Sequence, residues 1–307
     1  MKFVLNQPVD LEESLTCEFK EVKAQPLQIV GKTVDEYVVA FLNEAGGSIY
    51  WGIRDADRIV TGLSASAKMC DELKQVIGQK LSAIAPQIPA ATVDVPFHRV
   101  SDVTGALMHD TYVLEVRVTR PEVPGLFLTG AGDAYRKTLG GTKKLSGAEL
   151  FLALAGPIQA KLSKPKAPAM LDRFPALYRR FQVVESLVRG KRVLWVDDQP
   201  SNNFYERLAL SHMGLMVDIA TTSGEGLSAA AQLQPAVIIS DMERNGQHDA
   251  GLRFLRSARA EGIRAPIIFY IGEVIDALGV PAGAFAITDR ADEVLHLVLD
   301  VLERAAG

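Results

Sequence analysis

Apolar and polar positions alternate over residues 13–20, which read Glu-Ser-Leu-Thr-Cys-Glu-Phe-Lys. If this stretch is a β-strand, its period of two places three apolar side chains on one face and three polar side chains on the other. The polar face then carries Thr16, Glu18 and Lys20. An acid, a cation and a hydroxyl on one short strand face indicate a site rather than a solvated edge.

The next segments predict helices and further strands. Thr33 and Glu36 have the spacing of a capping box, and apolar residues continue at helical intervals as far as Ala45. Gly46 and Gly47 then end the helix, where a positive φ or a close backbone approach is needed. We expect a strand over 48–53, a second helix over 69–84, and strands near 91–95 and 111–118.

Apolar strands and helical periods alternate from residue 193 onwards. The pattern predicts strands over 193–196, 216–220, 235–241 and 267–270, and helices over 203–213 and 224–233. Buried strands that alternate with helices indicate an α/β domain, a doubly wound parallel sheet of flavodoxin-like order. Ligands of such sheets bind beyond the carboxyl ends of the strands.

Composition narrows the class of protein. The chain has 307 residues, enough for two domains, and 48% apolar with 23% charged residues is typical of a globular protein. It lacks an apolar run of about 18 residues, and residues 1–11 lack a signal-peptide core, so we expect no membrane association and a cytoplasmic location. Two cysteines without a CxxC pair argue against a disulfide framework or a zinc site.

The charge distribution suggests three segments. Residues 1–155 carry a net charge of −3, residues 156–192 carry +7, and residues 193–307 carry −8. We therefore predict two acidic domains joined by a basic linker and a connecting helix. That amphipathic helix, over 172–188, could join the domains, dimerise, contact nucleic acid or pack on the second domain.

Three motifs in the first segment point to one family. They are ES-x3-EFK at Glu13, N-x2-GG at Asn43 and G-I-x-D at Gly52. In order and spacing they resemble the Schlafen AlbA_2 domain, which is described as a DNA-binding domain. The stretch from Tyr135 to Leu145 resembles the segment that closes such domains. The resemblance covers roughly 13–154 and implies an α+β fold there.

The resemblance also implies a candidate catalytic site. In the nuclease branch of Schlafen proteins, matching positions form a metal-dependent ribonuclease site, and here they hold Glu13, Glu18 and Asp55. Three carboxylates suit Mg²⁺ or Mn²⁺, which could activate water for attack on a phosphate. Lys20 could hold that phosphate. Nucleic-acid binding without cleavage, or a purely structural role, are the alternatives.

Basic residues near the end of the first domain form a candidate nucleic-acid surface. They are Arg136, Lys137, Lys143 and Lys144. Contacts of this kind to phosphates would position RNA or DNA without reading its sequence. The alternative is a solvated edge with no ligand.

The second domain resembles the receiver domain of response regulators. Asp197 and Asp198 follow its first strand, and Asp241 follows a later one. In receivers the matching acid pair binds Mg²⁺ and the later aspartate accepts a phosphoryl group, so these residues are candidate metal ligands and Asp241 is a candidate phosphoacceptor.

Departures from the receiver pattern argue against phosphorylation. No lysine follows Lys191, and Arg290 stands where the receiver lysine is expected. Ile271 occupies the place of the usual Thr or Ser. Without that hydroxyl and lysine the domain is predicted to be a pseudo-receiver that acts through a protein partner or a homodimer.

These observations predict a nucleic-acid-binding regulatory or defence protein with a metal-dependent endoribonuclease site under receiver control. Two alternatives stay open. One is a non-enzymatic DNA-binding transcriptional regulator of the response-regulator type, and the other is a signalling scaffold.

Overall fold

The computed structural model describes residues 2–122, 125–160, 170–272 and 279–306. Residues 161–169 of the predicted basic linker lie outside the described residues. The chain divides into two compact units, Met1–Ser146 and Gly147–Gly307. The domain end predicted at residue 155 falls inside helix α3 (Gly147–Ala160), which belongs to the second unit.

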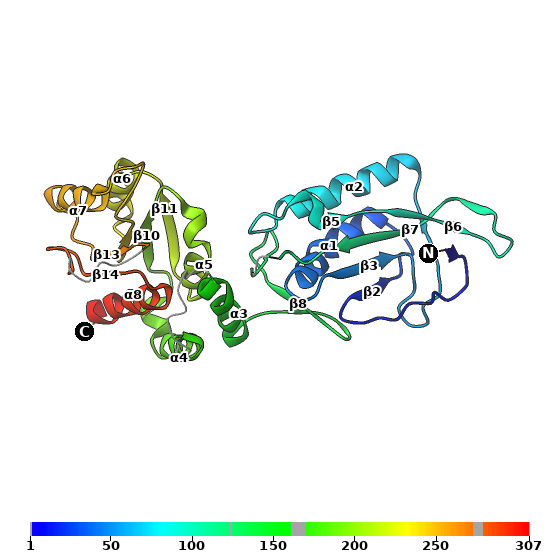
Figure 1. Ribbon diagram of the computed structural model, residues 1–307, viewed down its shortest axis with the longest axis horizontal. Helices are drawn as coiled ribbons and strands as arrows, with labels where there is room; N and C mark the ends of the chain where they lie inside the picture. Colours follow the sequence, from blue (N-terminus) through cyan, green and yellow to red (C-terminus); the bar gives the residue numbers. More distant parts are fainter. Residues whose placement is uncertain (1, 123–124, 161–169, 273–278, 307) are drawn as a thin grey trace. The chain divides into compact units, whose positions relative to one another are not determined.

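The first unit is a mixed sheet with two long helices (Figure 1). The sheet order is β1-β6-β7-β3-β2, and the short strands β4 and β5 also pair with β7. Neighbours β2 and β3 run parallel, whereas β3 and β6 are both antiparallel to β7. The elements are β1 (Phe3–Val4), β2 (Cys17–Lys20), α1 (Pro26–Leu42), β3 (Gly47–Trp51), β4 (Leu63–Ser64), α2 (Ala67–Ser82), η1 (Ala90–Thr92), β5 (Val93–Asp94), β6 (Phe97–Ser101) and β7 (Leu107–Val118). A separate hairpin follows, β8 (Tyr135–Thr138) with β9 (Gly141–Lys144).

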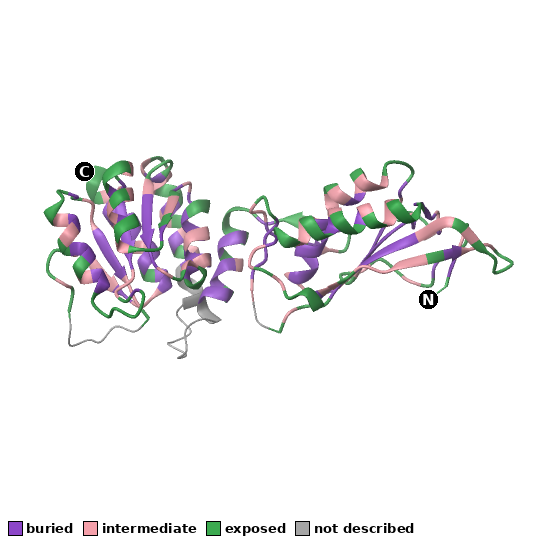
Figure 2. Cartoon of the chain, turned by 90° about the horizontal axis from the view of Figure 1, so that it is seen from above, coloured by how far each residue is buried: buried purple, intermediate pink, exposed green. Residues whose placement is uncertain are grey.

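The two faces of this sheet have different partners. Strand residues such as Ile49 and Val116 pack with Val34 of α1 and Leu73 of α2 in one apolar cluster. Strand residues of the opposite phase, such as Tyr50, pack with the N-terminal segment in a second cluster that contains no helix residue. Figure 2 shows the buried strands and the exposed outer surfaces of the helices.

Helix α1 begins earlier than the capping-box pattern predicts. Its first residue is Pro26, which follows Gln25 with a left-handed φ of 51°. Proline is favoured at the first helical position because it has no N–H to satisfy and its φ is already helical. Thr33 therefore lies inside the helix, where its hydroxyl donates to the carbonyl of Ile29.

The predicted glycine stop after α1 is confirmed. Gly46 and Gly47 have φ values of 78° and 148°. A Cβ on Gly47 would lie 2.4 Å from the carbonyl oxygen of Thr16, which precedes β2. Only glycine allows the chain to enter β3 so close to β2.

The second unit contains a five-stranded parallel sheet of order β11-β10-β12-β13-β14 (Figure 1). The strands are β10 (Arg192–Val196), β11 (Met216–Ala220), β12 (Val237–Ser240), β13 (Ile267–Tyr270) and β14 (Ala286–Thr288). The helices are α3, α4 (Met170–Val188), η2 (Pro200–Asn203), α5 (Phe204–His212), α6 (Ser223–Leu233), α7 (Ala250–Ala260) and α8 (Ala291–Ala306). Along the chain the sheet order is second, first, third, fourth, fifth strand.

The helix predicted over 172–188 is α4, and it packs against α8 within the second unit. Arg180 donates to Glu303 at 2.8 Å and 3.0 Å and to Asp300 at 2.5 Å. Among the alternatives for this helix, packing on the second domain is thus the one that the contacts support. None of the helices in the described ranges has the length and apolar character needed to cross a bilayer.

Candidate functional sites

Glu18 is buried at the centre of the first candidate site. It lies on β2 and faces α1, and its residue is only 2% exposed. One carboxylate oxygen is 2.7 Å from Lys20 Nζ and accepts the Tyr37 hydroxyl at 3.2 Å. The other is 2.7 Å from Nζ of Lys137, whose side chain is fully buried. Both oxygens of Glu18 are therefore held by ammonium groups of the same chain.

The electrostatics agree with this pairing. Burial works to lower the pKa of Lys20, but the hydrogen bond and the charge of Glu18 outweigh it and raise that pKa. Burial, reinforced by Glu18, raises the pKa of Tyr37 to about 12. The cluster is a locked ion pair with a neutral tyrosine beside it.

The structure does not bring the predicted catalytic acids together. Glu13 accepts the N–H of Phe19 at 3.1 Å, whereas the exposed Asp55 accepts the N–H of its neighbour Ala56. Within the described ranges, the only three acidic, His or Cys side chains whose ligand atoms lie within 4.8 Å of one another are Asp197, Asp198 and Asp241. Metal-dependent cleavage at Glu13, Glu18 and Asp55 stays a prediction.

The predicted nucleic-acid contacts lie on the hairpin β8–β9 but differ in exposure. Lys137 is buried against Glu18, so it cannot reach a phosphate in this structure. Arg136 pairs with Glu44 at 3.2 Å, and Lys144 pairs with Asp133 at 2.7 Å. Lys143 is exposed. The outward-facing part of the predicted surface is therefore Arg136, Lys143 and Lys144.

In the second unit the three aspartates meet where the prediction places them. Asp197 and Asp198 follow β10 and Asp241 follows β12, and these two strands are parallel neighbours. Asp197 accepts the Asn203 amide at 2.6 Å, and Asp198 accepts the N–H of Asn245 at 2.7 Å. They line a polar pocket of about 290 Å³ together with Gln199, Asn202, Asp241, Glu243, Asn245, Gly246 and Gly272.

The carboxylates in this pocket repel one another. Burial, followed by the charge of Asp197, raises the pKa of Asp241 to about 6. Two like charges at close range disfavour each other's ionised form, and a cation would relieve that cost. The donor set consists of carboxylate and amide oxygens, which fits Mg²⁺ or Mn²⁺.

Arg244 lies beneath the acidic pocket as a buried cation. Its residue is 2% exposed, and Nη1 donates to the carbonyl of Asp241 at 2.6 Å and to the Ser240 hydroxyl at 2.9 Å. Nη2 donates to the hydroxyl of Ser223, at the start of α6. Burial lowers the pKa of Arg244, whereas the nearby aspartates act in the opposite direction. The sequence analysis missed this residue, although a charged side chain in place of the receiver Met-Pro segment was a visible signal.

The residues at the two altered receiver positions have other contacts. Arg290 donates through Nη2 and Nε to Asp292 at 2.8 Å and 3.3 Å, and Asp292 is only 2% exposed. Ile271 packs against the apolar cluster between the sheet and α7. Neither contact is one that a phosphoryl group on Asp241 would make.

Residues 13–146 match the family described as Schlafen, AlbA_2. An AlbA_2 domain is therefore present in the first unit. The comparison with curated proteins gives no match.

Solved structures similar to this chain are receiver domains. The receiver domain of the Francisella response regulator 1452 is 19% identical, with a TM-score of 0.35, over 38% of this chain and 99% of that one. The chemotaxis response regulator CheY4 of Vibrio cholerae is 25% identical, with a TM-score of 0.32, over 37% of this chain and 98% of that one. TrrA from Thermotoga maritima is 23% identical, with a TM-score of 0.32, over 36% of this chain and 98% of that one.

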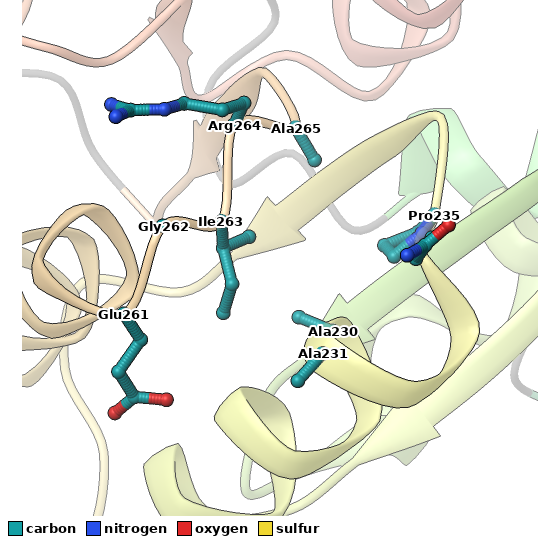
Figure 3. Close-up of a pocket in the computed structure, with 9 residues that line it drawn as sticks. Ala230, Ala231, Pro235, Glu261, Gly262, Ile263, Arg264 and Ala265 are labelled. Carbon is teal, nitrogen blue, oxygen red and sulfur yellow. The ribbon is translucent and has the colours of Figure 1, made fainter.

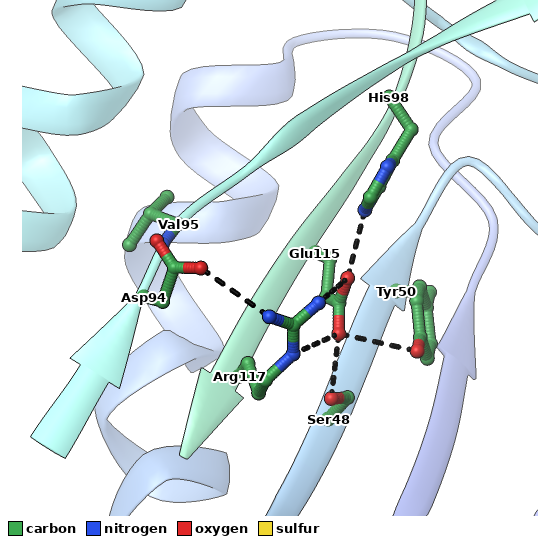
Figure 4. A network of polar contacts seen from close by, with 7 residues as sticks. All are labelled: Ser48, Tyr50, Asp94, Val95, His98, Glu115 and Arg117. Atoms are coloured by element: carbon green, nitrogen blue, oxygen red, sulfur yellow. Dashed lines mark hydrogen bonds and ion pairs between the residues drawn. The ribbon is translucent and has the colours of Figure 1, made fainter. Parts of the chain in front are cut away.

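The AlbA_2 domain contains a second polar network that the sequence analysis missed (Figure 4). The buried Glu115 of β7 accepts hydrogen bonds from Ser48 and Tyr50 of β3, and it contacts His98 of β6 and its near neighbour Arg117. The available signal was the alternation over 111–118, which places both Glu115 and Arg117 on the face opposite Val116.

A further pocket, of about 400 Å³, lies near the C-terminal ends of α6 and α7 (Figure 3). Its wall is mostly apolar and includes Ala230, Ile263 and Pro235, with Glu261 and Arg264 also lining it. It lies at the amino ends of β12 and β13, away from the three aspartates that follow β10 and β12. It therefore has no part in the acidic site.

Proposed function

We propose that this chain is a nucleic-acid-binding regulatory protein whose second domain is a cation-binding pseudo-receiver. The AlbA_2 domain would contact the sugar-phosphate backbone of RNA or DNA. The second unit, with its flavodoxin-like strand order, would bind Mg²⁺ or Mn²⁺ and engage a protein partner or a second copy of the chain. The observation that carries the proposal is the convergence of Asp197, Asp198 and Asp241 without the groups that respond to phosphorylation.

The cation would be held by these three carboxylates, with the remaining positions taken by water and pocket oxygens. When bound, it would neutralise the repulsion that raises the pKa of Asp241. Phosphorylation could shift the domain only through contacts that differ between modified and unmodified states. Ile271 cannot donate a hydrogen bond, and Arg290 is already paired with Asp292.

The nucleic-acid contact would lie on the hairpin β8–β9 at Arg136, Lys143 and Lys144. Their intramolecular pairs are at least half exposed on the basic side, and such surface pairs are weak enough for a phosphate to compete. Cleavage is left out of the proposal, since a metal at Glu18 would have to displace both Lys20 and Lys137.

Two titrations of the full chain test the proposal. Calorimetry with MgCl₂ or MnCl₂ should give one site that is lost in Asp241→Asn, while Glu261→Gln, at the opposite pocket, keeps it. Anisotropy with a single-stranded oligonucleotide should show affinity that falls with salt. The slope should fall by about 0.7–0.9 for each lysine reversed at Lys143 or Lys144. Reversal of Lys68 on α2 is the control. Absence of cation binding, or binding insensitive to the hairpin charges, would contradict the corresponding half.

A further inference from the structure

The network around Glu115 lies on the sheet face that is not packed by α1 and α2. His98 contacts the ring of Phe3, with centroids 5.2 Å apart, and Tyr50 belongs to the same cluster as Phe3. The helices pack on the residues of opposite phase, such as Ile49 and Val116. The polar groups of the network therefore share the face without helices.

Glu115 determines which nitrogen of His98 carries the proton. Burial alone would raise the pKa of Glu115, but the hydrogen bonds from Ser48, His98 and Arg117 outweigh it and keep that pKa below its usual value. An ionised carboxylate can only accept, so the His98 Nε2, 2.7 Å away, must be the donor. In the neutral ring, Nδ1 is then a proton acceptor.

The remaining acceptor of His98 is accessible. Its side chain is 27% exposed, whereas that of Glu115 is 3% exposed. Within the described residues, His98 contacts Glu115 and Phe3, and Nδ1 takes part in neither hydrogen bond nor ion pair. A buried carboxylate thus fixes an imidazole with its free nitrogen available to a ligand.

Arg117 places a cation beside this acceptor. Its Nε and Nη2 donate to the two oxygens of Glu115 at 3.1 Å and 3.0 Å, which leaves Nη1 facing away from the carboxylate. Nη1 reaches only the exposed Asp94, at 3.4 Å. Half of the Arg117 side chain is exposed. An anion could therefore replace Asp94 on Nη1 at little cost.

Stability alone is a weak reason for this arrangement. Burying a carboxylate with its partners is often no better for folding than an apolar residue of similar volume. We propose that this face binds a ribose phosphate, with a ribose hydroxyl donating to His98 Nδ1 and a phosphate accepting from Arg117 Nη1. Glu115 is the positioning residue. The choice of a phosphate rests on the nucleic-acid function proposed for this domain, and the ligand could be an RNA strand or a free ribonucleotide.

The 2′-hydroxyl provides the test, since it distinguishes RNA from DNA and is lost as a donor on methylation. The full chain is titrated with three oligonucleotides of one sequence: RNA, DNA and 2′-O-methyl RNA. We expect RNA to bind about fivefold more tightly than the other two, the size of one net hydrogen bond. His98→Phe should remove the preference while affinity for DNA stays unchanged. Arg117→Lys should weaken RNA binding, because lysine cannot keep both Glu115 contacts and reach the phosphate.

NMR of the His98 ring identifies the source of the ligand and checks the positioning role. In the wild type the ¹⁵N shifts should report the Nε2–H tautomer, and Glu115→Gln should alter that tautomer balance. Adenosine 5′-monophosphate that shifts Nδ1 while the three strands bind equally would support the free-ribonucleotide form of the site. DNA binding without an RNA preference, together with a His98 ring that ignores the mononucleotide, would overturn this inference and leave the proposed function standing. Failure to bind any strand or the mononucleotide would overturn both.

Discussion

The ammonium group of Lys137 lies 2.7 Å from a carboxylate oxygen of Glu18, and both side chains are buried. These two residues come from β8 and β2, and the pair connects the hairpin β8–β9 to the sheet. Each had been assigned a different role from the sequence, Glu18 as a metal ligand and Lys137 as a phosphate contact. Their pairing makes Glu18 a structural residue first.

We therefore predict that Glu18→Gln destabilises the AlbA_2 domain. The substitution leaves the buried Lys137 without its counter-charge, which should cost about 3 kcal/mol of unfolding free energy. Urea denaturation of the full chain measures this cost. Glu12→Gln is the control, because Glu12 is highly exposed and its pair with Arg58 should contribute about 0–1 kcal/mol.

The double variant Glu18→Gln with Lys137→Met separates charge from shape. It removes both buried charges, so part of the lost stability should return. If the single variant is as stable as the wild type, Glu18 is not held as the structure indicates. Loss of RNA cleavage in Glu18→Gln would then be better evidence for a catalytic role.

Local patterns in the sequence predicted the elements, and neighbouring strand ends predicted one site. Asp197 and Asp241 follow parallel strands that pair directly, so the alternation of strands and helices was enough to bring them together. The start of α1 was predicted wrongly because the capping-box spacing at Thr33 was given more weight than Pro26.

Contacts that depend on distant pairing could not be predicted in this way. Glu18 and Lys137 are far apart in the sequence, and no periodicity places β8 beside α1. The Glu115 network requires the register in which Tyr50 pairs with Glu115 and Ser48 with Arg117. That register is set by the packing of both sheet faces, which one strand's sequence does not contain.

The pH dependence of stability should reveal the repulsion at Asp241. Its pKa is raised to about 6 from 3.8, so the folded state binds a proton more readily than the unfolded state. Stability is then lost as pH rises from about 4 through 6, and the loss is complete above 6. We expect metal-free Asp241→Asn to be about 1–2 kcal/mol more stable than the wild type at pH 7.5, because the open pocket screens part of the effect.

Differential scanning calorimetry at pH 4 and pH 7.5, with chelator present, measures this difference. The advantage of Asp241→Asn should disappear at pH 4, where Asp241 is protonated in the wild type. Glu261→Gln, in the pocket at the other end of the sheet, should change stability little at either pH. An advantage of equal size at both pH values would mean that the substitution acts through packing rather than charge.

Arg244 and a bound cation should be partly interchangeable. Both place positive charge next to the three aspartates, Arg244 from beneath and the cation from the pocket. Arg244→Met removes the buried guanidinium and its hydrogen bonds to Ser240 and Ser223, so we expect a loss of about 2–4 kcal/mol without metal. Added Mg²⁺ should raise the Tm of this variant more than that of the wild type. An equal shift in the two proteins would show that Arg244 and the cation are not coupled; Arg256→Met, on the exposed side of α7, is the control.

Beryllofluoride with Mg²⁺, which mimics a phosphoryl group on an aspartate, should not change the assembly of this protein. The reason is the geometry at two positions. Ile271 offers no hydroxyl, and Arg290 is held by the buried Asp292 through two hydrogen bonds. Even if the group binds at Asp241, the domain lacks contacts that would favour one conformation over another. Size-exclusion chromatography with light scattering, with and without beryllofluoride, should therefore give the same mass, and oligonucleotide affinity should stay within about twofold. The variant with both Ile271→Thr and Arg290→Lys restores a hydroxyl and a compact ammonium, which the planar guanidinium cannot imitate. A response in that variant alone would show that these two positions decide the outcome. A several-fold response in the wild type would show that the second domain is a phosphorylation switch after all, operated by residues other than these two.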